Sequence, residues 1–147
     1  MATRRLSREF AVQLLYQNDL NPEPLDEAFP EFWAERPCDA KTRNFAETLA
    51  RGVIEHIETL DGLIKQHTTN WDIRRITAVD RNVLRVALYE MLYCPDIPPV
   101  VSINEAVEIA KKFGTEESGR FLNGILDSIM KELPRPSREA GPASPAS

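Results

Sequence analysis

Residues 96–127 mark the ends of two successive helices almost completely. Ser102 and Glu105 have the spacing of a capping box, in which the serine hydroxyl accepts from the Glu105 amide and the glutamate accepts from the Ser102 amide. Gly114 follows the apolar stripe of this helix, where a left-handed residue commonly ends a helix. Thr115 is then placed to cap a last helix. This stretch predicts two well-bounded helices in succession.

Helical spacing of apolar residues extends along nearly the whole chain, which predicts an all-α fold. Asp39 and Thr77 are expected to cap two of the earlier helices, whereas Pro30 weakens another. Gly52 costs about 1 kcal/mol relative to alanine in a helix interior, so it either allows close packing or has no role. A turn or short helix is expected at 71–76. The expected earlier helices span about 3–20, 24–35, 39–67 and 78–93.

The length and composition fit one globular domain followed by a tail. The chain has 147 residues, 42% of them hydrophobic and 28% charged. We expect a domain over residues 1–133, and a disordered tail over 134–147, where Pro, Ser, Ala, Gly and Arg dominate. The chain has no run of 18 apolar residues and no apolar signal-peptide core near its start, so we expect a cytoplasmic protein. Cys38 and Cys94 are expected to be reduced.

The charge is distributed unevenly along the chain. The net charge is −5, yet residues 1–8 carry Arg4, Arg5 and Arg8 and no acid. Residues 19–39 carry seven acids against one arginine. Positive charge at a helix N-terminus opposes the helix dipole, so helix stability does not explain the arginines. From spacing alone, a solvated basic end and an RNA-contact patch fit equally well.

Motifs for catalysis and for metal or cofactor binding are missing from the sequence. His56 and His67 are eleven residues apart, and no Cys, Asp or Glu pattern completes a metal site with them. The chain has no Gly-rich phosphate loop, nucleophile elbow or dinucleotide fingerprint. We therefore expect a protein that is not an enzyme and that uses no cofactor.

Several polar and aromatic residues have two readings from the pattern alone. Asp80 and Arg81 fit either local pairing at a helix start or a protein-contact surface. Phe121 has the spacing of a core residue, although aromatic rings also stack on unpaired bases. Arg120 fits a solvated helix charge, and Gln13 offers a neutral hydrogen-bonding group near the arginines.

Four segments together resemble the NusB family of transcription antitermination factors. They are Arg8–Tyr16 (REFAVQLLY), Asp80–Glu90 (DRNVLRVALYE), Ile103–Lys111 (INEAVEIAK) and Phe121–Asp127 (FLNGILD). The resemblance covers most of residues 4–130 and implies six to seven helices in two packed helical subdomains. It also implies pairing with NusE, a small-subunit ribosomal protein, and binding of boxA RNA within an antitermination complex on RNA polymerase during ribosomal RNA transcription.

The same resemblance implies roles for individual residues. The NusE-facing positions are Tyr16 and Asp80, and Arg81 is the neighbouring candidate for partner contact from its place at the helix start. With only three arginines at the N-terminus, RNA affinity is expected to be modest and to depend on NusE. Gln13 joins the candidate RNA contacts because it lies near the arginines. The RNA contacts that the resemblance implies are Arg4, Arg5, Arg8, Glu117, Arg120, Phe121 and Asn123.

Other classes of function predict different behaviour. A protein-interaction scaffold with incidental RNA contact would bind a protein partner without RNA crosslinks in its first helix. An RNA cytosine methyltransferase can carry a similar helical domain ahead of a catalytic domain, but the short tail is expected to leave no room for one. The sequence has no clean heptad seam, so it leaves open whether the protein forms a homodimer.

Overall fold

The computed structural model describes residues 2–68 and 76–133, with side chains from Arg4 onward. This part of the chain is all-α, as predicted, and none of its helices is both long and apolar enough to cross a membrane. The turn or short helix expected at 71–76, except for Ile76, and the tail expected at 134–147 lie outside the described residues. The helices are α1 (Ala2–Leu20), α2 (Leu25–Ala34), α3 (Ala40–Glu55), α4 (Ile57–Gln66), α5 (Ala78–Tyr93), α6 (Pro99–Phe113) and α7 (Glu116–Glu132).

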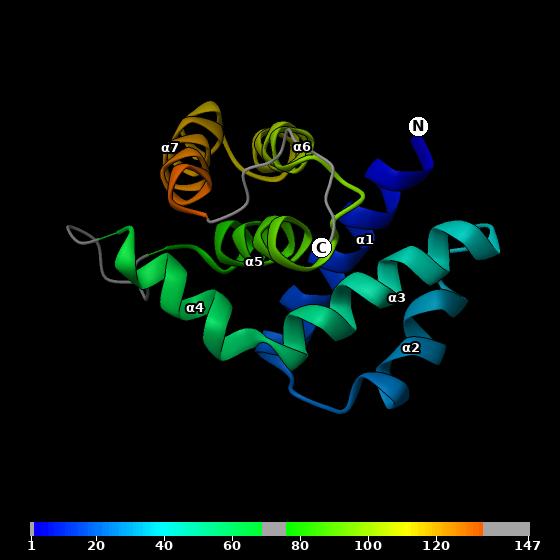
Figure 1. The fold of residues 1–147 in the computed structure, drawn as a ribbon. Coiled ribbons are helices and arrows are strands. Elements are labelled where there is room, and N and C mark those ends of the chain that lie inside the picture. Colours follow the sequence, from blue (N-terminus) through cyan, green and yellow to red (C-terminus); the bar gives the residue numbers. More distant parts are fainter. Residues whose placement is uncertain (1, 69–75, 134–147) are drawn as a thin grey trace.

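Helix α5 lies at the centre of the molecule, where it packs against α1, α3, α4, α6 and α7 (Figure 1). On one side, α1 and α3 pack together and an edge-to-face contact of Phe10 with Phe32 joins α2 to α1. On the other side, α6 and α7 lie side by side over α5. The broad apolar surface of α5 predicts this position, because a helix buried on several sides needs apolar residues around much of its circumference.

Three predicted caps are confirmed. The Asp39 carboxylate accepts from the Thr42 amide at 2.8 Å and begins α3. The hydroxyl oxygens of Thr77 and Thr115 accept from the third amide of α5 and α7, both at 3.1 Å. Each cap satisfies a backbone donor that has no partner inside its helix.

The predicted capping box is wrong. Helix α6 begins at Pro99 rather than near Ser102, because proline fixes a helical φ and lacks the amide hydrogen that a first helical residue leaves unpaired. Ser102 is a buried residue of the second turn, and its hydroxyl donates to Glu90 of α5 at 2.6 Å. Glu105 binds Arg5 of α1 instead of its own backbone. Both side chains therefore hold other helices rather than the end of their own.

Two predictions about helix ends also need correction. Gly114 ends α6 with φ of −127°, so no left-handed residue is used there. The long helix expected at 39–67 is two helices that meet at an angle at His56 (Figure 1). At this bend the His56 ring stacks on Tyr93 of α5, with 4.0 Å between centroids.

Gly52 of α3 marks a close approach of two helices. A β-carbon at this position would overlap the ring of Tyr89 on α5. The close-packing alternative for Gly52 is therefore confirmed.

Both cysteines are free thiols, as expected. Burial raises the pKa of Cys94 to about 11, with the negative charges of Glu90 and Asp96 adding to the rise. This thiol is therefore protonated at neutral pH and is a poor nucleophile.

Candidate nucleic-acid interface

A groove over α6 brings Arg5 of α1 together with Arg120 and Asn123 of α7. The volume of the groove is about 330 Å³. Val107 and Lys111 of α6 lie between the two sides, and Lys111 packs closely against Gly119 of α7. Candidate RNA contacts from the two ends of the chain therefore share one surface. We call it the α6 groove.

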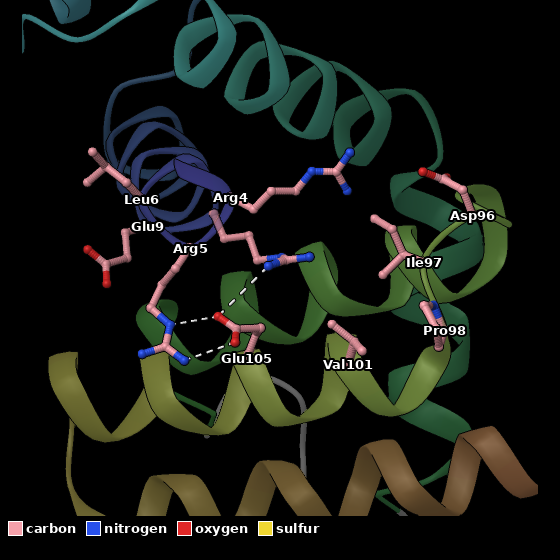
Figure 2. A pocket seen from close by; sticks show the side chains of 10 residues that line it. Arg4, Arg5, Leu6, Glu9, Asp96, Ile97, Pro98, Val101 and Glu105 are labelled. Carbon is pink, nitrogen blue, oxygen red and sulfur yellow. Dashed lines mark hydrogen bonds and ion pairs between the residues drawn. The ribbon is translucent and has the colours of Figure 1, made fainter. Parts of the chain in front are cut away.

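Arg5 is held in a two-point ion pair and still keeps free donors. Its Nε and Nη2 atoms donate to the two carboxylate oxygens of Glu105 at 2.7 and 2.9 Å (Figure 2). The Arg5 side chain is 48% exposed. A guanidinium has five N–H groups, so three remain for a phosphate or a base edge. Glu105 thus orients Arg5 without using all of its hydrogen-bonding capacity.

The Arg5–Glu105 pair should give a measurable acid dependence. The hydrogen bonds from Arg5 hold the pKa of Glu105 below its usual range. A carboxylate with a lowered folded-state pKa stabilises the fold fully above its unfolded value of about 4.3, and this stabilisation is lost as pH falls through the folded value. We expect Glu105→Gln to be less stable than the parent at pH 7, and the difference to shrink in acid.

Urea unfolding between neutral pH and the acid limit of the fold would measure this difference. Glu108→Gln is the matched control, since Glu108 is 49% exposed and its ion pair with Lys111 is longer, at 3.5 Å. Its effect should be smaller at every pH. A Glu105→Gln difference that stayed constant or grew as pH falls would contradict the expectation.

Arg8 lies inside the protein rather than in the α6 groove. Its Nε and Nη2 atoms donate to the carboxylate of Glu90 at 2.6 and 3.0 Å, and the same carboxylate accepts from Ser102. The pair is almost completely buried, with side-chain exposure of 6% for Arg8 and 1% for Glu90. These contacts join α1, α5 and α6.

Arg4 lies on a second groove, between the start of α1 and the segment that joins α5 to α6. Its guanidinium carbon is 4.3 Å from the centroid of the Phe45 ring on α3, a cation–π contact. The groove has a volume of about 790 Å³ and also contains Ile97, Pro98 and Val101 (Figure 2). Arg5 lines both this groove and the α6 groove, so the two surfaces are continuous.

The start of α7 forms a third groove with the start of α5. Glu117, Arg120 and Phe121 line it from α7, and Asp80 lines it from α5. The volume is about 610 Å³. Arg120 also lines the α6 groove and has no ion pair with the described residues, so this cation is available to a ligand on either side of α7.

The remaining candidate residues lie elsewhere. Gln13 accepts from Arg36 Nε at 3.3 Å and so faces the end of α2. Tyr16 is exposed on α1. Arg81 donates to the Ile76 carbonyl at 3.1 Å, and its guanidinium lies 3.6 Å from the carboxylate of Asp19, so its ion pair is with α1 rather than with Asp80.

Glu90 and Glu105 are the residues that sequence reasoning missed. Glu105 was interpreted as a cap, which hid its pairing with Arg5. Glu90 did carry a signal, because it is an acid within the otherwise apolar end of the central helix. A buried carboxylate needs a partner, and the partner here comes from another helix.

Charges in the α6 groove are balanced. The cations of the groove are Arg5, Lys111 and Arg120, and its acids are Glu105, Glu108 and Glu116. Because its positive and negative side chains are equal in number, the groove offers directed hydrogen bonds rather than a strong positive field, which disfavours non-specific binding of polyanions. Separately, no cluster of His, Cys, Asp or Glu in the described residues is placed to hold a metal ion.

Known proteins resemble this chain over nearly its whole described length. The model of the NusB family matches residues 5–131. A transcription antitermination protein NusB from Desulfosudis oleivorans is 48% identical over 138 residues, covering 90% of this chain and 88% of that protein. NusB from T. maritima has a solved structure that is 43% identical, with a TM-score of 0.80 and coverage of 88% of this chain and 91% of that one.

A second solved structure adds a complex to this comparison. It contains antitermination factors NusB and NusE with double-stranded RNA. Its matching chain is 30% identical, with a TM-score of 0.82, and the match covers 90% of this chain and 99% of that one. The fold and the family match agree, and the chain belongs to the NusB family of transcription antitermination proteins.

Proposed function

We propose that this protein is a non-catalytic adaptor that pairs with NusE and binds boxA RNA. It acts in the cytoplasm during ribosomal RNA transcription, within an antitermination complex on RNA polymerase. The observation that carries the proposal is the α6 groove, which places Arg5 beside Arg120 and Asn123. The likeness to a NusB chain solved with NusE and double-stranded RNA supports it.

The α6 groove offers two kinds of hydrogen-bonding contact to RNA. Arg5 and Arg120 supply charged donors for phosphate oxygens, and Asn123 supplies an amide that both donates and accepts. Arg4 extends the basic surface along α1, toward the second groove. Arg8 contributes by holding α1 against α5 and α6, because its guanidinium is buried against Glu90.

The balanced charge of the groove bears on the partner. Few phosphates can be neutralised by this surface alone, so the salt dependence of RNA binding should be shallow. Additional contacts must come from the partner, which fits a shared RNA site with NusE. The exposed Tyr16 on α1 is the best-placed of the predicted partner contacts.

We predict that Arg5→Ala weakens boxA binding by about tenfold or more, as expected for losing charge-assisted hydrogen bonds. The measurement is a fluorescence anisotropy titration of labelled boxA RNA, with and without NusE. Arg51→Ala is the matched control, because Arg51 is also about half exposed, at 50%, and pairs with a carboxylate, that of Asp26. It lies on α3, outside the three grooves described above, and should leave affinity unchanged.

Two results would count against the proposed function. One is equal RNA affinity of the Arg5→Ala and Arg51→Ala proteins. The other is RNA affinity that does not increase when NusE is added. Binding of NusE with no measurable RNA contact would instead favour a protein-interaction scaffold.

A further inference from the structure

A buried amide lies between the end of α1 and the first half of α5. It belongs to Asn82, whose side chain is fully buried. Its Nδ2 atom donates to the carboxylate of Asp19 on α1 and to the Ala78 carbonyl, both at 2.9 Å. Its Oδ1 atom accepts from Arg85 at 3.0 Å. Both amide hydrogens and the carbonyl oxygen are therefore used within the protein.

Arg85 extends these contacts to α4. Its Nε and Nη2 atoms donate to the two carboxylate oxygens of Asp61, both at 2.8 Å. Its Nη1 atom also lies 3.5 Å from Asp19, and Arg81 approaches the same carboxylate at 3.6 Å. Three helices are thus joined by one set of side chains. We call Asp19, Asp61, Arg81, Asn82 and Arg85 the Asn82 network.

Stability alone does not explain a polar network at this position. Buried ion pairs can often be replaced by apolar side chains of similar volume without loss of stability. A fully bonded network has another effect, because its directed hydrogen bonds fix one arrangement of the elements that it joins. Helices α1 and α4 both pack on α5, so the network sets how each of them lies along α5.

The network holds the part of α1 that carries the predicted partner contact. Asp19 follows Tyr16 by three residues and directly precedes Leu20, and these two side chains are 37% and 67% exposed. Residues three and four apart are neighbours on a helix surface, so Tyr16 lies beside Asp19 and Leu20. On α5, Asn82 directly follows Arg81. The bond between Asp19 and Asn82 therefore fixes Tyr16 relative to the start of α5.

We propose that the Asn82 network positions the partner-binding surface, because it holds the end of α1, and with it Tyr16, in the orientation that NusE binds. Asn82 is a positioning residue and not a contact, since a fully buried side chain cannot touch the partner. A surface that is ordered before binding loses less entropy on binding, and this raises affinity. The inference rests on the proposed pairing with NusE and adds the residues that prepare the surface for it.

The test is the affinity for NusE, measured without RNA by isothermal titration calorimetry. Asn82→Leu and Asp19→Ala should each bind about tenfold more weakly, the effect of having to order one or two side chains on binding. Asp19→Asn should bind nearly as well as the parent, because its amide oxygen can still accept from Asn82. Thermal melts of each variant confirm that folded proteins are compared.

Ser7→Ala is the matched control. Ser7 is a buried residue at the opposite end of α1, and its hydroxyl donates to the Thr42 carbonyl of α3 at 2.7 Å. Its replacement breaks a buried hydrogen bond between two helices, as Asn82→Leu does, but far along α1 from Tyr16. NusE affinity should therefore remain that of the parent.

A double-mutant cycle identifies the route by which Asn82 acts. If the network positions Tyr16, the Asn82→Leu/Tyr16→Ala protein should bind NusE no more weakly than Tyr16→Ala alone. An effect that does not pass through Tyr16 would add to that of Tyr16→Ala. Should Asn82→Leu not fold, the same cycle with Asp19→Ala gives the answer.

The outcomes separate this inference from the proposed function. Parent-like NusE affinity in folded Asn82→Leu or Asp19→Ala overturns only the positioning role, and so does an additive cycle. A loss in Asp19→Asn or Ser7→Ala as large as that in Asp19→Ala also overturns it. Tyr16→Ala with parent-like affinity does the same, because the network would then have no contact to position. A parent protein that does not bind NusE overturns both.

Discussion

Replacing Glu90 by alanine is expected to lower the free energy of unfolding by about 3–5 kcal/mol, the cost of breaking a buried ion pair. The carboxylate accepts from Arg8 at 2.6 and 3.0 Å and from Ser102 at 2.6 Å. Its removal leaves the Arg8 guanidinium buried beside apolar Val86 and Ile109. Only Glu105, at 3.8 Å, remains near that charge. Urea unfolding monitored by circular dichroism measures the loss.

Two controls test whether burial explains the size of this effect. Asp26→Ala breaks the exposed pair with Arg51, which has the same 2.6 Å separation, and should cost less than about 1 kcal/mol. The double variant Arg8→Met/Glu90→Leu should recover most of the loss, because apolar side chains of similar volume often replace a buried pair without cost. A double variant as unstable as Glu90→Ala would contradict this explanation.

The double variant also separates the two roles available to Arg8. The resemblance to the NusB family implies an RNA contact, whereas the structure buries the side chain against Glu90. If Arg8 acts by holding α1, a folded double variant should bind boxA nearly as well as the parent. A loss as large as that of Arg5→Ala would instead make Arg8 a direct contact.

Local signals predicted the parts of the fold that depend on neighbours in sequence. Asp39, Thr77 and Thr115 cap their helices as expected, because a cap needs only a backbone amide three residues away. Ser102 and Glu105 have equally good spacing, yet their partners are Glu90 and Arg5. Spacing alone cannot reveal a competing partner that another helix supplies.

The candidate site was predictable as a list of residues but not as a surface. Charge along the chain identified the N-terminal arginines, and the family resemblance identified four residues of α7, which are Glu117, Arg120, Phe121 and Asn123. Neither could show that Arg5 and Arg120 share a groove, since that depends on how α1 and α7 pack on α6. The break at His56 likewise coincides with a contact to another helix, the ring of Tyr93 on α5.

Replacing Gly52 by alanine is expected to destabilise the fold by up to about 2 kcal/mol, because overpacking a tight contact usually costs about 1–3 kcal/mol and the helix preference of alanine offsets about 1 kcal/mol of that cost. An added β-carbon would overlap the ring of Tyr89, so that ring or the helix must move. The ring has little freedom, because it lies 6.1 Å from His56 and 5.4 Å from Tyr93 between centroids. Alanine in place of glycine favours a helix by about 1 kcal/mol, so the measured loss is what remains after that gain.

Gly62→Ala is the control that isolates the clash. Gly62 is an exposed residue of α4, and nothing lies within 4 Å of an added β-carbon. Here the helix preference acts alone, so the variant should be more stable by about 0.5–1 kcal/mol. The two substitutions, measured by urea unfolding, should therefore change stability in opposite directions. If both stabilised the protein, α3 and α5 would not be in the close contact described.

Tyr89→Leu should reduce the penalty of Gly52→Ala, because it removes the ring atoms that the β-carbon meets.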